Sequence, residues 1–245
     1  MVQLNNVLGY KNLKILQDDR FFSFSLDSII LSNYSSIRLR DKKIVDFCTG
    51  NGIVPIIVSQ RCVADIYGVD IQEELIDLAN KSIKYNNLDD RIHFICQDVI
   101  TFSLEHLNEF DFVLCNPPYF KVNANTSFNK SYNKMIARHE ILIDLSQLCK
   151  CANRVLKDNG VFSMVHRSDR LIEIISTLRE HNLEPKSLKF IYNTCNSDST
   201  LVLIQSQKCG NVGLKILKPL FLRNVDGSFT DEYKRLQEEI IYGSK

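Results

Sequence analysis

The stretch Val45-Asp46-Phe47-Cys48-Thr49-Gly50-Asn51-Gly52 joins an apolar run, predicted to be a strand over Lys43–Phe47, to a helical pattern over Ile53–Arg61. Glycines in such a loop let the backbone approach a ligand closely, and the amino end of the helix favours a negatively charged group. A dinucleotide fits less well, because Pro55 stands where a dinucleotide fingerprint has its third small residue. Asp46, just before the loop, instead suits a ligand that carries an ammonium group.

Strand-like and helical segments alternate along the chain, which predicts an α/β fold with a parallel sheet covered by helices on both faces. Besides residues 43–47, the predicted strands are residues 66–69, 92–96, 111–115, 161–165, 188–192 and 201–205. The predicted helices are residues 28–34, 53–61, 72–85, 137–155 and 171–180, and residues 158–160 are expected to form a turn. A short segment around Asp198 separates the last two strands, so they are expected to form an antiparallel hairpin. A seven-stranded sheet that ends in an antiparallel hairpin differs from an ordinary dinucleotide-binding sheet.

Length and composition limit the possibilities further. A chain of 245 residues with 44% hydrophobic content is long enough for one large α/β domain, and no linker or internal repeat divides it. We expect a single domain over residues 1–245, with residues 1–40 as a cap on a core of residues 41–245. The net charge of +1 neither favours nor excludes nucleic acid as a partner.

Several classes of protein are not indicated. The eight cysteines include no Cys-x-x-Cys pair, so neither a zinc site nor a disulfide framework is signalled. No signal peptide, transmembrane run or lipidation motif is apparent, which predicts a cytoplasmic protein that does not enter a membrane. No feature of the sequence points to an obligate protein partner.

Two acidic residues follow the next two predicted strands. Asp70 follows residues 66–69, where a carboxylate can accept both ribose hydroxyls of an adenosine group; it can equally cap the helix that begins near Gln72. Asp98 follows residues 92–96 and can accept from the exocyclic amine of adenine, or it is a solvated turn residue. The two acids together are a stronger signal than either alone, because each follows a successive strand.

Asn116-Pro117-Pro118-Tyr119 directly follows the fourth predicted strand. The motif delivers an amide oxygen, a main-chain carbonyl, a stiff turn and an aromatic face to the carboxyl edge of the sheet. This set suits a planar amino group that is held by acceptors while it attacks an electrophile. The alternative is that Pro-Pro merely ends the strand.

Together, residues 46–52, Asp70, Asp98 and residues 116–119 resemble the ordered motifs of class I methyltransferases that use S-adenosylmethionine. The Asn-Pro-Pro-Tyr form resembles those members that methylate exocyclic or amide nitrogens. Cys48 replaces the first glycine of the usual Asp-x-Gly-x-Gly-x-Gly loop. The resemblance implies a Rossmann-like seven-stranded sheet with an antiparallel final hairpin. It also implies a cofactor site made by Asp27, Asp46, Gly50, Gly52, Asp70, Asp98 and Asn116.

Residues 22–31 and 137–140 are similar to a narrower group, the bacterial tRNA (adenine-N6) methyltransferases that modify adenine 37 of valine tRNA. The similarity runs nearly end to end and includes a strand over residues 215–218 and a closing helix after Phe229. It implies S-adenosylmethionine as cofactor and tRNA as partner. Asp27 either caps the helix of residues 28–34 or lies near the methionine end of the donor, and the roles of Arg138 and His139 stay open.

The implied reaction is an in-line displacement, in which the donor methyl lies about 3 Å from the target nitrogen. The side-chain oxygen of Asn116 and the carbonyl of Pro117 are expected to accept the two N–H groups of adenine N6. These bonds localise the nitrogen lone pair, so no strong general base is required. Tyr119 is expected to stack on the base, which must leave its neighbours to reach the pocket.

Two other functions stay open. The first keeps the chemistry but changes the acceptor to another RNA or to a protein glutamine amide. Methyltransferases of the glutamine type usually carry a longer helical N-terminal domain than residues 1–40 would provide. The second is a non-enzymatic, adenosine-binding regulatory protein, which the intact Asn-Pro-Pro-Tyr motif argues against.

The segment after the motif supplies Lys121, Lys130 and Lys134 among aromatic and polar residues, which suits contact with RNA phosphates. Changing all three to alanine should reduce the slope of log affinity for tRNA against log salt by up to about 2, at roughly 0.7 per single-strand contact. Donor affinity should not change. Titrations at several salt concentrations check this, and an unchanged slope would move the RNA contacts towards the chain ends.

Overall fold

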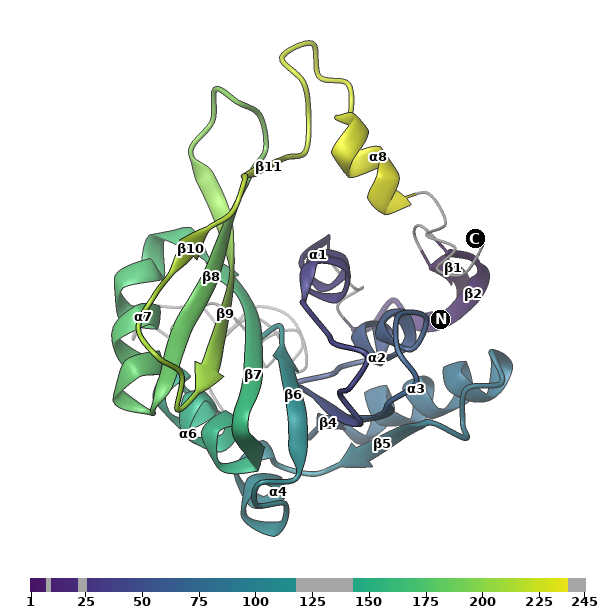
Figure 1. Cartoon of the computed structure of the whole chain (residues 1–245). Helices are drawn as coiled ribbons and strands as arrows, with labels where there is room; N and C mark the ends of the chain where they lie inside the picture. The colour runs from purple at the N-terminus through teal and green to yellow at the C-terminus, as the bar shows by residue number, and fades with distance from the viewer. Residues whose placement is uncertain (8–9, 22–25, 118–142, 238–245) are drawn as a thin grey trace, which may run out of the picture.

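The computed structural model describes residues 1–7, 10–21, 26–117 and 143–237 (Figure 1). A nine-stranded sheet forms the centre of the molecule. In spatial order its strands are β10 (Lys215–Ile216), β8 (Leu183–Tyr192), β9 (Ser199–Lys208), β7 (Leu156–Arg167), β6 (Phe110–Cys115), β3 (Lys43–Phe47), β4 (Asp65–Asp70) and β5 (Ile92–Cys96), and β11 (Leu220–Phe221) also pairs with β8.

The strand directions agree with the predicted fold class. Strands β5, β4, β3, β6 and β7 are mutually parallel, whereas β9 runs antiparallel to both β7 and β8. The seven predicted strands and the final hairpin are therefore confirmed. The two short strands β10 and β11 extend the sheet beyond β8, and β10 is the strand that the family resemblance implies near residues 215–218.

Helices cover both faces because successive strand residues point to opposite sides. One face carries α1 (Leu26–Tyr34), α2 (Ile53–Val58) and α3 (Glu73–Tyr85). The other face carries α4 (Val99–Glu105), α6 (Leu145–Val155) and α7 (Leu171–Glu180), and η1 (Ser168–Arg170) and α8 (Asp231–Gln237) complete the described helices (Figure 1).

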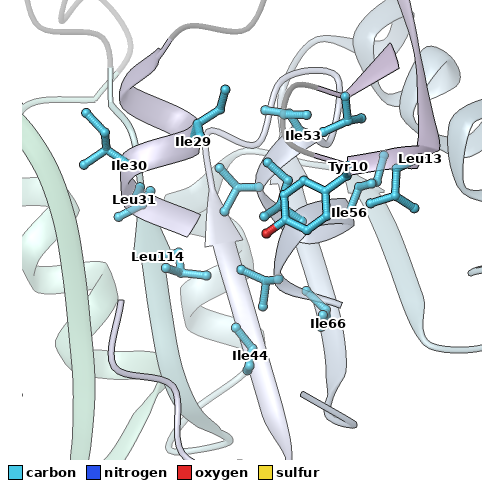
Figure 2. Close-up of a cluster of buried hydrophobic side chains, with 14 of the residues drawn as sticks. Tyr10, Leu13, Ile29, Ile30, Leu31, Ile44, Ile53, Ile56, Ile66 and Leu114 are labelled. Carbon is cyan, nitrogen blue, oxygen red and sulfur yellow. The ribbon is translucent and has the colours of Figure 1, made fainter. Parts of the chain in front are cut away.

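Each face has its own apolar core. On the α1 side, Ile44, Ile66 and Leu114 of the strands pack with Ile29 of α1 and Ile56 of α2 (Figure 2). On the other side, residues of the same strands that point the opposite way, such as Val45, Val69 and Val113, pack with α4 and α6. Among the described residues, no helix is long and apolar enough to cross a membrane.

A β-hairpin formed by β1 (Val2–Val7) and β2 (Tyr10–Asp18) precedes α1 and was not predicted in the cap. It is fastened to α3 by polar bonds. Leu16 N donates to Ser82 Oγ at 2.9 Å, and Asn86 bonds both the amide and the carbonyl of Lys14, at 2.9 and 2.7 Å. The first residues of the chain are thus attached to the helix that follows the second parallel strand.

Three predicted boundaries were wrong. The helix predicted over residues 137–155 begins at Leu145, because Asp144 and Gln147 form a reciprocal capping box; residues 137–142 lie outside the described part. The turn predicted over residues 158–160 is part of β7, where the pairing with β6 shifts register and Asn159 has a φ of 62°. The helix after the glycine loop ends at Val58 instead of Arg61.

The glycine loop packs closely against β5. A Cβ atom on Gly68 of β4 would lie 2.5 Å from Cδ1 of Phe94 and 2.8 Å from Oγ1 of Thr49. A Cβ atom on Gly52 would lie 2.3 Å from Cζ of the same ring. Glycine at both positions therefore lets the Phe94 ring fill the space under the loop.

Gly68→Ala should therefore lower the free energy of unfolding by about 1–3 kcal/mol, the usual cost of overpacking a well-filled site. Urea denaturation measures the change. Replacing Phe94 by leucine in the same chain should recover part of the loss, because the clash is with the ring. Simple additivity of the two changes would show that the ring does not cause the strain.

Candidate functional site

The predicted site lies at the carboxyl edge of the central parallel strands. Phe47 is paired with both Val69 and Cys115, and Asp70 is paired with Cys96, so four strands end side by side. The structure places the predicted residues Asp46, Gly50, Gly52, Asp70, Asp98 and Asn116 at or just after these strand ends. Ligands bind at this edge in open α/β sheets.

The glycine loop contains three residues in the left-handed region. Cys48 and Gly50 each have a φ of 56°, and Gly52 has a φ of 82°. Cys48 thus adopts a conformation that glycine would adopt more easily, at a cost of about 1–2 kcal/mol. The loop keeps this path although a cysteine replaces the first glycine.

Asp70 fastens this loop to the end of β4. Its Oδ2 accepts from Gly50 N at 2.8 Å, and its Oδ1 accepts from Gln72 N and Gln72 Nε2 at 3.0 and 3.2 Å. The N-cap residue of α3 is Gln72, so Asp70 is not the cap itself. Burial raises the pKa of Asp70, and the bonds from Gln72 and Gly50 oppose that rise. A carboxylate has about four acceptor positions and these bonds occupy three of them, which leaves capacity for one further donor such as a ligand hydroxyl.

Asp46 is the most unusual group at this edge. It is 1% exposed, and neither carboxyl oxygen has a hydrogen-bond partner among the described residues. The buried Thr49 Oγ1 likewise lacks a partner of acceptable geometry within that part of the chain. Burial raises the pKa of Asp46 well above its usual value; the nearby Thr49 hydroxyl opposes this shift, and the charge of Asp70 adds to it. Buried polar atoms are normally satisfied, so this group suits a ligand that brings a cation or hydrogen-bond donors.

Asp98 and Asp27 occupy the first turns of two helices. Asp98 is the N-cap of α4, where its Oδ1 accepts from Ile100 N at 2.9 Å and Thr101 N at 3.1 Å. Both bonds end on Oδ1, so the carboxylate still has acceptor capacity at Oδ2. Asp27 is the second residue of α1, which begins at Leu26, so it lies within the helix instead of capping it.

Asn116 follows β6 and is joined to α1. Its Nδ2 donates to Ser28 Oγ at 3.0 Å, and Ser28 is 6% exposed. Pro117 is buried beside it. Ser28 was not among the predicted site residues, although a serine within the apolar pattern of a predicted helix was a readable signal.

Several predicted residues lie outside the described part of the chain: Tyr119, Lys121, Lys130, Lys134, Arg138 and His139.

Sequence reasoning also missed the charged end of β7. Met164 pairs with Cys115, so the residues that follow it run beside Asn116 and Pro117. His166 is fully buried there, and burial lowers its pKa to about 4, which leaves the imidazole neutral near pH 7. Arg170 pairs with Glu173 at 2.8 Å in the following turn. The signal was a predicted strand that ends in His-Arg-Ser-Asp-Arg.

A metal site is not evident in the part of the chain that the structure describes. The eight cysteines are free thiols. No group of three or more His, Cys, Asp or Glu side chains within the described ranges is arranged to hold a metal ion. The acceptor-rich edge instead suits an organic ligand with hydroxyl, amino and ammonium groups.

Comparison with curated proteins gives relatives that share one name. A tRNA1(Val) (adenine(37)-N6)-methyltransferase from Phocaeicola vulgatus is 28% identical over 200 residues, which cover 82% of this chain and 83% of that protein. A protein of the same name from Christiangramia forsetii is 22% identical over 240 residues, which cover 96% of this chain and 97% of that protein.

Solved structures are similar in fold. A predicted O-methyltransferase from Agrobacterium tumefaciens has a TM-score of 0.70 at 19% identity, covering 86% of this chain and 95% of that chain. The P. horikoshii protein TYW2 in complex with MeSAdo has a TM-score of 0.60 at 14% identity, covering 85% of this chain and 72% of that chain. These similarities confirm the predicted methyltransferase type of α/β sheet.

A family model described as a methyltransferase domain matches residues 39–220. The matched region starts just before β3 and ends in β11, so it contains the glycine loop, Asp46, Asp70, Asp98 and the Asn116 motif. Because this model covers well over half of the sequence, the chain belongs to the methyltransferase domain family.

Proposed function

We propose that this protein transfers a methyl group from S-adenosylmethionine to N6 of an adenine in tRNA, with adenine 37 of valine tRNA as the acceptor. The single observation that carries the proposal is the position of Asn116. It follows the strand beside the glycine loop, and a hydrogen bond to α1 fixes its amide. The shared name of the relatives from Phocaeicola vulgatus and Christiangramia forsetii supports the choice of acceptor.

The residues present fit such a donor. The Asp46 carboxyl and Thr49 hydroxyl, which have no hydrogen-bond partner among the described residues, suit the ammonium group of its methionine part. Asp70, at the end of β4, has acceptor capacity for a ribose hydroxyl, and Asp98 Oδ2 has capacity for the adenine amine. At Gly50 an added Cβ would meet no atom within 4 Å, so this glycine leaves open space beside the loop where the donor would pass. When bound, the donor supplies a methyl group on a positively charged sulfur.

The protein's own part in the transfer is to hold and orient the acceptor. The lone pair of adenine N6 is delocalised into the ring, so the amine is a weak nucleophile. Asn116 Oδ1 and the Pro117 carbonyl accept its two N–H groups and favour a geometry in which the lone pair points at the methyl group. Tyr119 would stack on the extruded base, and Lys121, Lys130 and Lys134 would meet the flanking phosphates.

The direct test compares tRNA from cells with and without the gene. The tRNA is digested to nucleosides and scored for N6-methyladenosine by mass spectrometry, and purified protein is then given unmodified valine tRNA and labelled donor. Loss of N6-methyladenosine without the gene, and its restoration in vitro, is the expected result. Methylation of a different RNA, or of a protein glutamine, would keep the chemistry and reject the acceptor.

Asp46→Asn should weaken donor binding and at the same time stabilise the ligand-free protein at neutral pH. In the unfolded chain Asp46 ionises near about pH 4, whereas the native protein keeps it protonated to higher pH. Its contribution to stability therefore falls as the pH rises from about 4 to the raised native pKa. The variant should therefore be more stable than the wild type at pH 7, by a difference that shrinks as the pH falls towards about 4.

Urea denaturation across this pH range measures the effect, and calorimetry measures donor affinity. Asp41→Asn is the matched control, because Asp41 is also buried but accepts from Arg38 N and Nε at 2.7 and 2.9 Å. That variant should lose stability at neutral pH. If both variants lose stability equally, Asp46 has a partner in the native protein and its assignment to the donor is wrong.

Asn116→Ala should lower the rate of methyl transfer by roughly 100-fold or more and leave donor affinity nearly unchanged. The reason is that the lost amide orients the acceptor amine, whereas Asp46, Asp70 and Asp98 supply most of the polar groups for the donor. Single-turnover kinetics and donor calorimetry separate the two effects. Asn33→Ala on α1 is the control, since Asn33 is also half-buried but bonds Tyr10 and the helix backbone. Near-normal turnover by the Asn116 variant would place the chemistry elsewhere.

A further inference from the structure

Ser28 of α1 is joined by a hydrogen bond to the Asn116 side chain. The bond runs from Asn116 Nδ2 to Ser28 Oγ at 3.0 Å, between residues that are 88 positions apart in the sequence. Ser28 is 6% exposed, so little water competes for its hydroxyl. The bond therefore fixes one end of the amide from outside the motif.

We propose that Ser28 is a positioning residue for methyl transfer, which holds the Asn116 amide in place against α1 with its oxygen presented to the acceptor amine. This inference rests on the proposed function, because it assumes that Asn116 receives a nitrogen that carries hydrogen. Ser28 does not contact the acceptor or the donor in this role. It acts through Asn116.

The need for such a residue follows from the symmetry of an amide. The terminal torsion of asparagine is broad and nearly two-fold, so the oxygen and the NH₂ group exchange places with little change in shape. The flipped amide would point N–H donors at an amine that also donates, and the acceptor bond would be lost. In the observed orientation the Ser28 hydroxyl accepts from Nδ2, which leaves the oxygen end of the amide facing away from α1. A hydroxyl can also donate, so the acceptor amine, which brings only N–H groups to Asn116, completes the choice between the two orientations.

The helix that carries Ser28 is itself held firmly. Ile29, Ile30 and Leu31 are at most 1% exposed in the core beneath it. Its carboxyl end is bound by Arg61, which donates to the carbonyls of Ser32 and Ser35, the latter at 2.9 Å.

Beyond the helix end, Ser35 Oγ and Ser163 Oγ of β7 lie 2.7 Å apart in a further hydrogen bond. The Ser28 hydroxyl is thus presented from a rigid support, as precise orientation of a functional group requires. A serine on a mobile loop could not hold the amide in one place in the same way.

The test compares Ser28→Ala with Ser32→Ala. Both serines are buried on the same helix, and Ser32 Oγ donates to Ser28 O at 2.7 Å without contacting Asn116. Alanine is the best helix former, so neither change should break α1. Ser28→Ala should lower kcat by about threefold to tenfold, the worth of one hydrogen bond, with donor affinity unchanged. Ser32→Ala should keep the wild-type kcat, and Ser28→Thr, which retains a hydroxyl, should recover most of the loss.

A double-mutant cycle of Ser28 and Asn116 gives the decisive test. Adding Ser28→Ala to Asn116→Ala should have no further effect on kcat, because Ser28 acts only through the amide. An additive loss would make Ser28 a general structural residue and overturn the proposal. Equal kcat for wild type and Ser28→Ala would overturn it as well.

A measurement that does not depend on methyl transfer tests the bond between Ser28 and Asn116 separately from the proposed function. In protein labelled with ¹⁵N at asparagine, the Asn116 side-chain signals are identified by their absence in Asn116→Ala. Their hydrogen exchange should be slow in wild type and Ser32→Ala and faster in Ser28→Ala. Equal exchange in all three would refute the orienting bond. A wild-type protein that transfers no methyl to any RNA would instead refute the proposed function while leaving the bond itself measurable.

Discussion

The hydrogen bond from Gly50 N to Asp70 Oδ2 is the contact on which the geometry of the site depends. It joins the loop after β3 to the end of β4, so that two neighbouring strands deliver one continuous binding edge. The carboxylate also accepts from Gln72 at the start of α3, which fixes the next helix to the same point. A buried acid with several N–H partners is rigid, and the loop inherits that rigidity. The left-handed residues of the loop are tolerated because this bond over-determines their path.

The end of β3 and the glycine loop contain several groups in energetically unfavourable states. Cys48 has a left-handed φ, Asp46 is a buried carboxyl without a described partner, and Thr49 has a buried hydroxyl in the same condition. Each of these features lowers the stability of the ligand-free protein. They occur within four consecutive residues, whereas the two apolar cores on either side of the sheet are well packed. A donor that satisfies these atoms would return part of the lost stability when it binds.

Sequence patterns predicted the parts of the fold that follow from local rules. The parallel strands were readable because each is a short, largely apolar run that ends at a loop or at polar residues, as residues 66–69 end at Asp70. The start of α6 was also readable, since Asp144 and Gln147 form a capping box, but the apolar periodicity was extended beyond it. The contact between Ser28 and Asn116 could not be predicted, because nothing local in either segment specifies a partner 88 positions away. The same holds for the N-terminal hairpin, whose anchors are on α3.

The position of α1 has a consequence for how the chain folds during synthesis. This helix leaves the ribosome early, yet its partners are made late: Ser35 bonds Ser163, and Tyr34 bonds Glu232, 198 positions further on. Until β7 and α8 emerge, its apolar residues have only α2 and the first strands to cover them. Contacts of such long sequence separation slow folding and prolong the exposure of hydrophobic surface. The helix that fixes the Asn116 amide is therefore fully packed only when nearly the whole chain is present. A truncated nascent chain could form the glycine loop, which would contact the donor, before the residues that would orient the acceptor are in place.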